Sequence, residues 1–213
     1  MPTLTNDNEL GGLASRVREL SDKLKLPPRH LIAIAMAETL FPDLNKVRIL
    51  DLACGHNFPV ISWFQDLNSG PALAGYFASV GAEVVGLDEW HFQRHNLFRD
   101  YNFVMKWGDA RHLQRYFSQE SFDLIVSTAY FGYISSRYGT RPSREMELGI
   151  LRDAKEITRK NGYGIHVLVD GYWQLTNEDL TDVGYRVLKG LGPSTSQHRN
   201  STAYENIVVL QRQ

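Results

Sequence analysis

Residues 47–63 read VRILDLACGHNFPVISW, and the arrangement of apolar and small residues in this stretch is informative. A short apolar run suits a buried strand, and it carries an acid, Asp51, near its end. The small residues Ala53, Cys54 and Gly55 follow before apolar sequence resumes. Small side chains let the backbone approach another molecule closely, so the turn leaves room for a ligand beside a carboxylate.

Four further runs suit buried strands, at 83–88, 103–106, 122–127 and 164–169. Helix-like sequence lies around them, at 58–67, 73–80, 90–99, 111–117 and 144–160. Alternating strands and helices predict βαβ units and a parallel sheet covered on both faces. The runs 184–188 and 205–211 have no long helix between them, which favours an antiparallel pair.

Two helices are predicted before the first strand, at 13–24 and 29–40, with the first dozen residues outside them. The expected fold is therefore α/β: a doubly wound, mostly parallel seven-stranded sheet with a C-terminal antiparallel hairpin and two N-terminal helices.

Composition limits the classes of protein to consider. The 213 residues are 43 % hydrophobic, enough for a full core in one domain, and the net charge of −1 gives no overall basic field for nucleic acid or anionic lipid. A single cysteine, Cys54, excludes an intramolecular disulfide and a cysteine-based zinc cluster. No run approaches the roughly 20 apolar residues of a membrane span, and no secretion signal is evident. We expect a cytoplasmic protein.

Acidic residues follow three successive strands. Asp51 ends the first, Asp88 and Glu89 the second, and Asp109 follows the third. The carboxyl ends of parallel strands meet at one edge of a sheet, where ligands bind. A carboxylate after the second strand can accept both hydroxyls of a ribose, and one after the third can accept an exocyclic amine. Each acid alone is equally well explained as a helix cap, but three in succession favour a site.

The segments VRILDLACGHN, GAEVVGLDEW and KWGDARHL, in that order, resemble the cofactor signature of class I S-adenosylmethionine-dependent methyltransferases. The resemblance runs from residue 47 to the C-terminus, because AKEITRKNGYGIHVLV resembles the helix and turn before the family's fifth strand. DVGYRVLK and YENIVVLQRQ resemble its closing hairpin. The resemblance implies a Rossmann-like methyltransferase fold, with S-adenosylmethionine as cofactor and S-adenosylhomocysteine as product.

Carried over position by position, the resemblance implies three contacts with the cofactor. Asp51 and the turn formed by Ala53, Cys54 and Gly55 would face its amino-acid part. The second strand end would hold the ribose and the third the adenine. The implied cofactor-binding residues beyond the first strand are Asp88, Glu89, Trp90, Gly108, Asp109, Ala110 and Ser127. The sequence departs from the family in its turn, which has one glycine where the family has two or three.

Two common nucleotide motifs are absent from the sequence. The first strand is not followed by G-x-G-x-x-G, which disfavours a nicotinamide-binding sheet, and no G-x-x-x-x-G-K-[ST] loop occurs. The wider turn suits a cofactor without a pyrophosphate.

Aromatic residues mark a candidate acceptor pocket. Tyr130 and Tyr133 follow the fourth strand, and Tyr172 follows the fifth, so these rings could line a pocket for a flat acceptor. The first two could equally pack beneath the 136–144 loop. His91 and His95 share a helical face but lack a third ligand, so no metal is predicted, and His166 is interpreted as a hydrogen-bonded core residue. No catalytic base is assigned.

The sequence thus predicts a methyltransferase that acts on a small-molecule acceptor, an aromatic one among the options. The alternatives are a non-catalytic binding protein or partner subunit with the same fold, and a methyltransferase that acts on protein or RNA. We expect residues 1–42 to form an N-terminal helical cap or lid and residues 43–213 the methyltransferase domain. No nucleic-acid or membrane partner is indicated, and the oligomeric state is not predicted.

Overall fold

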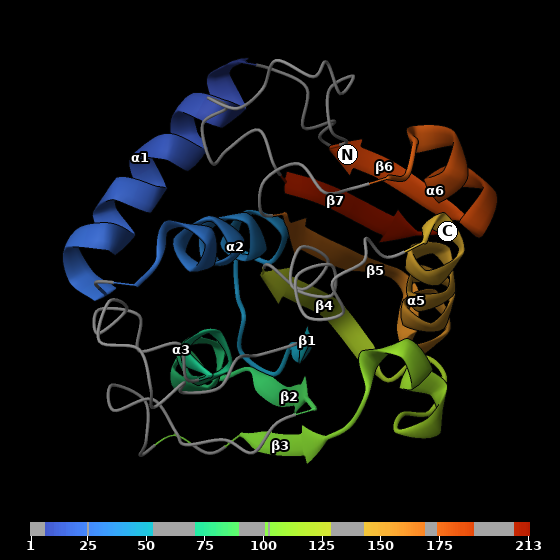
Figure 1. Ribbon diagram of the computed structural model, residues 1–213. Coiled ribbons are helices and arrows are strands. Elements are labelled where there is room, and N and C mark those ends of the chain that lie inside the picture. Colours follow the sequence, from blue (N-terminus) through green and yellow to red (C-terminus); the bar gives the residue numbers. More distant parts are fainter. Residues whose placement is uncertain are drawn as a thin grey trace, which may run out of the picture.

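The computed structural model describes residues 7–24, 26–52, 71–89, 101, 103–128, 143–168, 174–189 and 207–213, with only the backbone described for residues 7–11. The architecture is a central sheet with helices on both faces (Figure 1). None of the helices in these ranges combines the length and hydropathy that crossing a bilayer requires.

Seven strands form one sheet in the order β3-β2-β1-β4-β5-β7-β6 within the described ranges. Neighbours from β3 to β5 pair in parallel, and β7 runs antiparallel to both β5 and β6. This confirms the predicted doubly wound sheet and its C-terminal antiparallel hairpin. The strands are β1 Arg48–Leu52, β2 Glu83–Asp88, β3 Val104–Trp107, β4 Phe122–Thr128, β5 Thr158–Val167, β6 Tyr185–Lys189 and β7 Ile207–Arg212.

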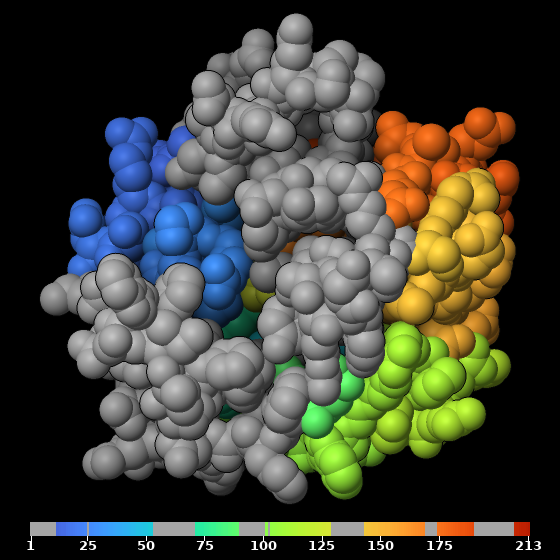
Figure 2. Space-filling model, in the orientation of Figure 1, coloured from blue at the N-terminus to red at the C-terminus, as the bar shows by residue number. Residues whose placement is uncertain are grey.

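Each face of the sheet has its own hydrophobic core. The helices α1 (Asp7–Leu24), α2 (Pro28–Leu40) and α3 (Ala72–Ser79) cover one face, where Ile49 of β1 and Val84 of β2 are buried. The opposite face carries α5 (Arg144–Ile157), α6 (Asn177–Val183) and the 3₁₀ helix η3 (Ala110–Arg115), which bury Leu50, Leu52 and Leu87. Figures 1 and 2 show α1 and α2 on one side and α5 and α6 on the other. Side chains alternate between faces along a strand, so these two cores assign a face to every strand-end residue.

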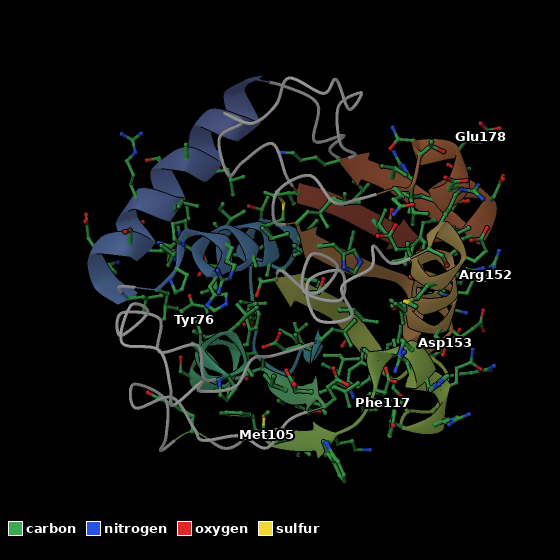
Figure 3. The ribbon with its side chains drawn as sticks, in the orientation of Figure 1. Tyr76, Met105, Phe117, Arg152, Asp153 and Glu178 are labelled. Carbon is green, nitrogen blue, oxygen red and sulfur yellow. The ribbon has the colours of Figure 1, made fainter. Side chains whose placement is uncertain are left out.

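The three helices of the first face are joined by polar contacts as well as by apolar packing. Arg16 of α1 donates to Glu38 of α2 at 2.7 Å, and the hydroxyl of Tyr76 on α3 donates to the same carboxylate at 2.6 Å. Figure 3 shows Tyr76 between α3 and α2. The two N-terminal helices are therefore part of one layer with α3.

The predicted boundary between α5 and β5 is wrong. The helix ends at Ile157 rather than residue 160, and β5 begins at Thr158 rather than 164. Pairing with β4 accounts for the difference, because Thr158 lies opposite Phe122 and Tyr163 opposite Leu124, with a register shift between them. Gly162 suits that irregularity, since a Cβ there would lie 2.9 Å from the carbonyl oxygen of Asp123.

The short helix α6 was not predicted, although its sequence, TNEDLTDVG, carries a local signal. Thr176 and Asp179 form a reciprocal capping box at its start, and Gly184 ends it at φ 98°. Other differences are small: α1 begins at Asp7 rather than residue 13, and η3 replaces the helix expected at 111–117. The helices expected at 58–67 and 90–99 lie outside the described residues.

Candidate functional site

Two buried acids lie side by side at the carboxyl ends of β1 and β2. Asp51 pairs with Gly86 of β2, and Asp88 lies two residues further along that strand. Asp51 lies two residues after Ile49, and Asp88 lies four residues after Val84, so each acid points to the same face of the sheet as that apolar residue. Both carboxyl groups therefore face the layer of α1, α2 and α3. They are only 1 % and 7 % exposed. The two acids predicted from sequence are therefore brought together.

Asp51 has an unusual environment for a carboxyl group. The backbone N–H of Ala74, in the first turn of α3, donates to it, and α3 has no side-chain cap of its own. Its second oxygen, Oδ2, is buried without a hydrogen-bond partner among the described residues. Burial raises the pKa of Asp51 to about 8, with a further increase from the charge of Asp88, although the Ala74 amide acts in the opposite direction. Such a group suits a positively charged or hydrogen-donating ligand.

The end of β3 is attached to the end of β2. Asp88 lies opposite Trp107, and the N–H of Gly108 donates to the carbonyl of Asp88 at 2.9 Å. The indole Nε1 of Trp107 donates to the carbonyl of Glu89 at 2.7 Å, although the ring is 68 % exposed. The residues predicted to follow the second and third strands therefore lie at one edge of the sheet.

Asp109 is engaged within its own loop. Its carboxylate caps η3 by accepting from the N–H of Arg111 at 2.9 Å, and it also accepts from the guanidinium of Arg111 at 2.8 Å. Burial raises the pKa of Asp109, but the hydrogen bonds from Arg111 outweigh burial and lower it overall. An adenine amine would have to share this carboxylate with Arg111, and the adenine contact of Asp109 stays a prediction.

The neighbours of Asp109 also have structural roles. A Cβ at Gly108 would lie 2.7 Å from the ring of Tyr116, whose hydroxyl accepts from the N–H of Asp109 at 3.2 Å. Ala110 is buried in the core beneath α5. Close ring packing therefore requires a glycine at position 108, whether or not a ligand binds there.

Ser127 lies on the opposite face from the two acids. It pairs with Leu52 of β1 and with His166 of β5, and its hydroxyl is 2.9 Å from Nδ1 of His166. Both residues are buried, and burial lowers the pKa of His166 to about 4, which keeps the imidazole neutral near pH 7. The prediction of a hydrogen-bonded core histidine is confirmed. The structure does not bring Ser127 together with Asp51 and Asp88.

Several predicted site residues lie outside the described residues. They are Ala53, Cys54, Gly55 and Trp90 of the proposed cofactor site and Tyr130, Tyr133 and Tyr172 of the proposed acceptor pocket. In the ranges that the structure describes, no three residues of the His, Cys, Asp and Glu types group as metal ligands would.

A cavity of about 670 Å³ lies away from these acids, at the amino ends of β1, β2 and β3. Arg48, Glu83, Val104, Phe117 and Phe122 are among its lining residues. Ligands of parallel α/β sheets bind at the opposite, carboxyl ends of the strands, so this cavity is not the candidate site.

Sequence reasoning missed one buried acid, Glu147 of α5. It is fully buried, and its Oε2 accepts from the backbone N–H of Gln174 at 3.2 Å. Burial raises the pKa of Glu147 to about 7, although the Gln174 amide opposes the increase. Its spacing from Leu151 and Ala154 places it on the apolar stripe of α5, and a glutamate at such a position is the signal that was available in the sequence.

Solved structures share this fold. A TehB-like S-adenosylmethionine-dependent methyltransferase from Corynebacterium glutamicum is 17 % identical at a TM-score of 0.55, covering 98 % of this chain and 100 % of the other. The 16S rRNA N2 G1207 methyltransferase of T. thermophilus, solved with AdoMet and guanosine, is 16 % identical at a TM-score of 0.55. That match covers 88 % of this chain and 44 % of the other.

A putative methyltransferase from Haloferax volcanii, in complex with the activator Trm112, is 15 % identical at a TM-score of 0.52 and covers 95 % of this chain and 96 % of the other. No protein-family model and no curated protein matches the sequence. The similarities show that the chain has the Rossmann-like fold of class I methyltransferases.

Proposed function

We propose that the protein is an S-adenosylmethionine-dependent methyltransferase that acts on a small-molecule acceptor. The observation that carries the proposal is the buried carboxyl of Asp51, whose Oδ2 has no partner among the described residues, beside Asp88 at the carboxyl edge of the sheet. The shared fold supports the same activity.

The two acids suit the chemical groups of this cofactor. Asp51 would accept from the ammonium of the methionine part, whose positive charge offsets the burial of a carboxylate. Asp88 would accept from the ribose hydroxyls, a pair of donors that one carboxylate can bind together. The bound cofactor supplies a methyl group on a positively charged sulfur, and the protein's part is to hold donor and acceptor in line and to exclude water.

A small acceptor is favoured over RNA by the charge of the chain. Proteins that bind RNA backbones generally present a basic surface, whereas this chain has a net charge of −1. The fold does not select the acceptor, since the T. thermophilus neighbour is an rRNA methyltransferase. The test is methylation of a cell extract that has first been treated with protease or with ribonuclease. Methylation that persists after both treatments would support a small acceptor, and methylation lost after either treatment would contradict it.

Calorimetry with S-adenosylmethionine and S-adenosylhomocysteine tests cofactor binding directly. We expect Asp88→Asn to weaken binding by about tenfold or more, as the loss of a charge-assisted pair of hydrogen bonds would. Glu83→Gln is the matched control, because Glu83 lies on the same strand at its exposed amino end, where its nearest ion-pair contact, with Arg48, is 3.9 Å.

The absence of heat and of any thermal shift with either ligand at millimolar concentration would defeat the proposal. Binding without methyl transfer to a broad panel of acceptors would instead favour a non-catalytic binding protein.

We also propose that the N-terminal helices, within residues 1–42, act as a cap over the site. The contacts of Glu38 with Arg16 and Tyr76 join α1 to α3, whose first turn donates to Asp51. Removal of residues 1–24 should reduce methyl transfer more than cofactor affinity. Equal losses, in a truncated protein whose circular dichroism shows a folded chain, would contradict this role.

A further inference from the structure

The helix α5 buries an acid where its pattern calls for an apolar side chain. Its buried residues are Glu147, Leu148, Ile150, Leu151, Ala154 and Ile157. Glu147 is 0 % exposed, and burial of a carboxyl group is unfavourable unless partners compensate for the lost hydration. An isosteric neutral residue would fill the same space at lower cost, so the acid calls for an explanation other than packing.

The described partners of Glu147 satisfy only one of its two oxygens. The N–H of Gln174 donates to Oε2 at 3.2 Å, whereas Oε1 is buried without a hydrogen-bond partner among the described residues. Buried carboxylates in proteins are usually paired with a cation or bound to a metal. In the described part of the chain Glu147 forms no ion pair, so Oε1 has room for a donor that the described residues do not supply.

The position of Glu147 is at the carboxyl edge of the sheet. It lies in the first turn of α5, which follows β4 in the chain, and it contacts Gln174, which follows β5. The carboxyl ends of the parallel strands β4 and β5 lie at one edge, so Glu147 is at the same edge of the sheet as Asp51 and Asp88, although α5 covers the opposite face from these two acids.

The surroundings of Glu147 are well supported. Arg144, three residues earlier in the same turn of α5, forms an ion pair with Asp179 of α6, which also accepts from the N–H of Thr176. The chain after β5 is therefore joined to the first turn of α5 by two separate contacts, at Glu147 and at Arg144. A carboxyl held in this way is preorganised to bind a ligand.

We propose that Glu147 binds an amine of the methyl acceptor and accepts its proton before transfer. The inference rests on the proposed function and names its substrate class: a small molecule with a primary or secondary amine. The ammonium would donate to Oε1. When its N–H bond breaks, the proton passes to Oε1 and the electron pair stays on nitrogen. That pair forms the new N–C bond with the methyl group, and the electrons of the broken C–S bond remain on sulfur.

The acid–base properties of Glu147 agree with this role. Burial raises the pKa of its carboxyl group to about 7, a value suited to taking up and releasing a proton near neutral pH. The elements packed around α5 also carry ionisable groups: Arg111, His112 and Arg115 on η3, Arg159, Lys160, Tyr163 and His166 on β5, and Glu178, Asp179 and Asp182 on α6. None of these groups is among the causes of the shift. Burial raises the pKa of Glu147, and the Gln174 amide opposes that increase.

The test compares Glu147→Gln with Glu145→Gln. Glu145 is the matched control, since it is an exposed acid in the same helical turn. The probes are benzylamine, tyramine and pentylamine, each paired with the alcohol of the same shape, added to the protein with S-adenosylhomocysteine. Affinity is measured from the thermal shift and by calorimetry.

We expect at least one amine to bind more tightly than its alcohol. Glu147→Gln should weaken the binding of that amine by about tenfold or more, as loss of a buried charge partner does. Glu145→Gln should leave the affinity for the amine unchanged. Wild-type affinity should rise as pH increases through about 7, where the carboxyl of Glu147 ionises, and the Gln variant should lack this rise. A purely structural role would not produce that pH profile.

Equal binding of amines and alcohols, amine affinity unaffected by Glu147→Gln, or no binding of any amine would each overturn the inference. Failure of the proposed function has a different signature, because S-adenosylhomocysteine alone would then not stabilise the wild type or either variant.

Discussion

The replacement Asp51→Asn tests the strand-end acid most directly. Asn keeps the size of the side chain and an oxygen that can accept from the N–H of Ala74, so α3 retains its partner. The change removes the ability to ionise and replaces the other carboxyl oxygen with an amide NH₂. Any change in stability with pH then reports the burial of the carboxyl group.

The size of the effect follows from the two pKa values. The carboxyl of Asp51 has a pKa of about 8 in the folded protein against a reference of 3.8. At pH 7 the unfolded chain is ionised at this position while the folded protein remains protonated. Each pKa unit between 3.8 and 7 corresponds to about 1.4 kcal/mol, so the native acid lowers the free energy of unfolding by about 4 kcal/mol at pH 7.

The sign is that of a carboxyl whose pKa is raised by folding. Its stabilising contribution is complete below pH 3.8 and is lost as the pH rises toward about 8. Asp51→Asn should therefore match the wild type near pH 4 and exceed its unfolding free energy by up to about 4 kcal/mol at pH 7. The same variant should bind S-adenosylhomocysteine more weakly, because the ammonium would lose a charged partner.

Urea unfolding at pH 4, 5.5 and 7, followed by far-ultraviolet circular dichroism, measures the difference in stability. Calorimetry at pH 7 measures the affinity. A variant that is less stable than the wild type at pH 7, or a difference that does not change with pH, would refute the reasoning. Either result would mean that groups within the chain already compensate for the burial of the Asp51 carboxylate, so that no ligand is needed to do so.

Three further substitutions, the first with a compensating second change, test the surroundings of the site by urea unfolding. Gly108→Ala should lower the free energy of unfolding by about 1–3 kcal/mol, because the new Cβ would overlap the Tyr116 ring, and Tyr116→Leu should restore part of the loss. Ser127→Ala should cost about 1–3 kcal/mol by removing the hydroxyl at Nδ1 of buried His166; no loss would show that this bond is dispensable. Asp179→Ala should cost about 1 kcal/mol or more through its capping box, and an unchanged stability would contradict that assignment.

Much of the fold was predictable from short-range patterns. Apolar runs at strand spacing located β2, β3 and β4 to within one residue of their ends, whereas β5 begins six residues earlier than predicted. The lack of a long helix between the last two runs indicated the antiparallel hairpin. Local periodicity and turn chemistry act over a few residues, so they can be read without knowing the partners. The same logic identified Asp51 and Asp88 as acids that share an edge, because parallel strands end together.

Contacts between distant segments determined the rest. β5 begins at Thr158 because β4 offers a pairing partner there, and Asp109 caps η3 through Arg111. Ser127 lies near the carboxyl end of its strand just as Asp51 does, yet it faces the α5 layer and bonds to His166.

Glu147 shows the same limit most clearly. In the sequence it is one acid among several at the start of a helix, and only the packing of α5 and the chain after β5 buries it with one oxygen lacking a partner among the described residues. Burial and electrostatics depend on which surfaces pack against one another in three dimensions, and residue spacing along the chain does not specify those contacts.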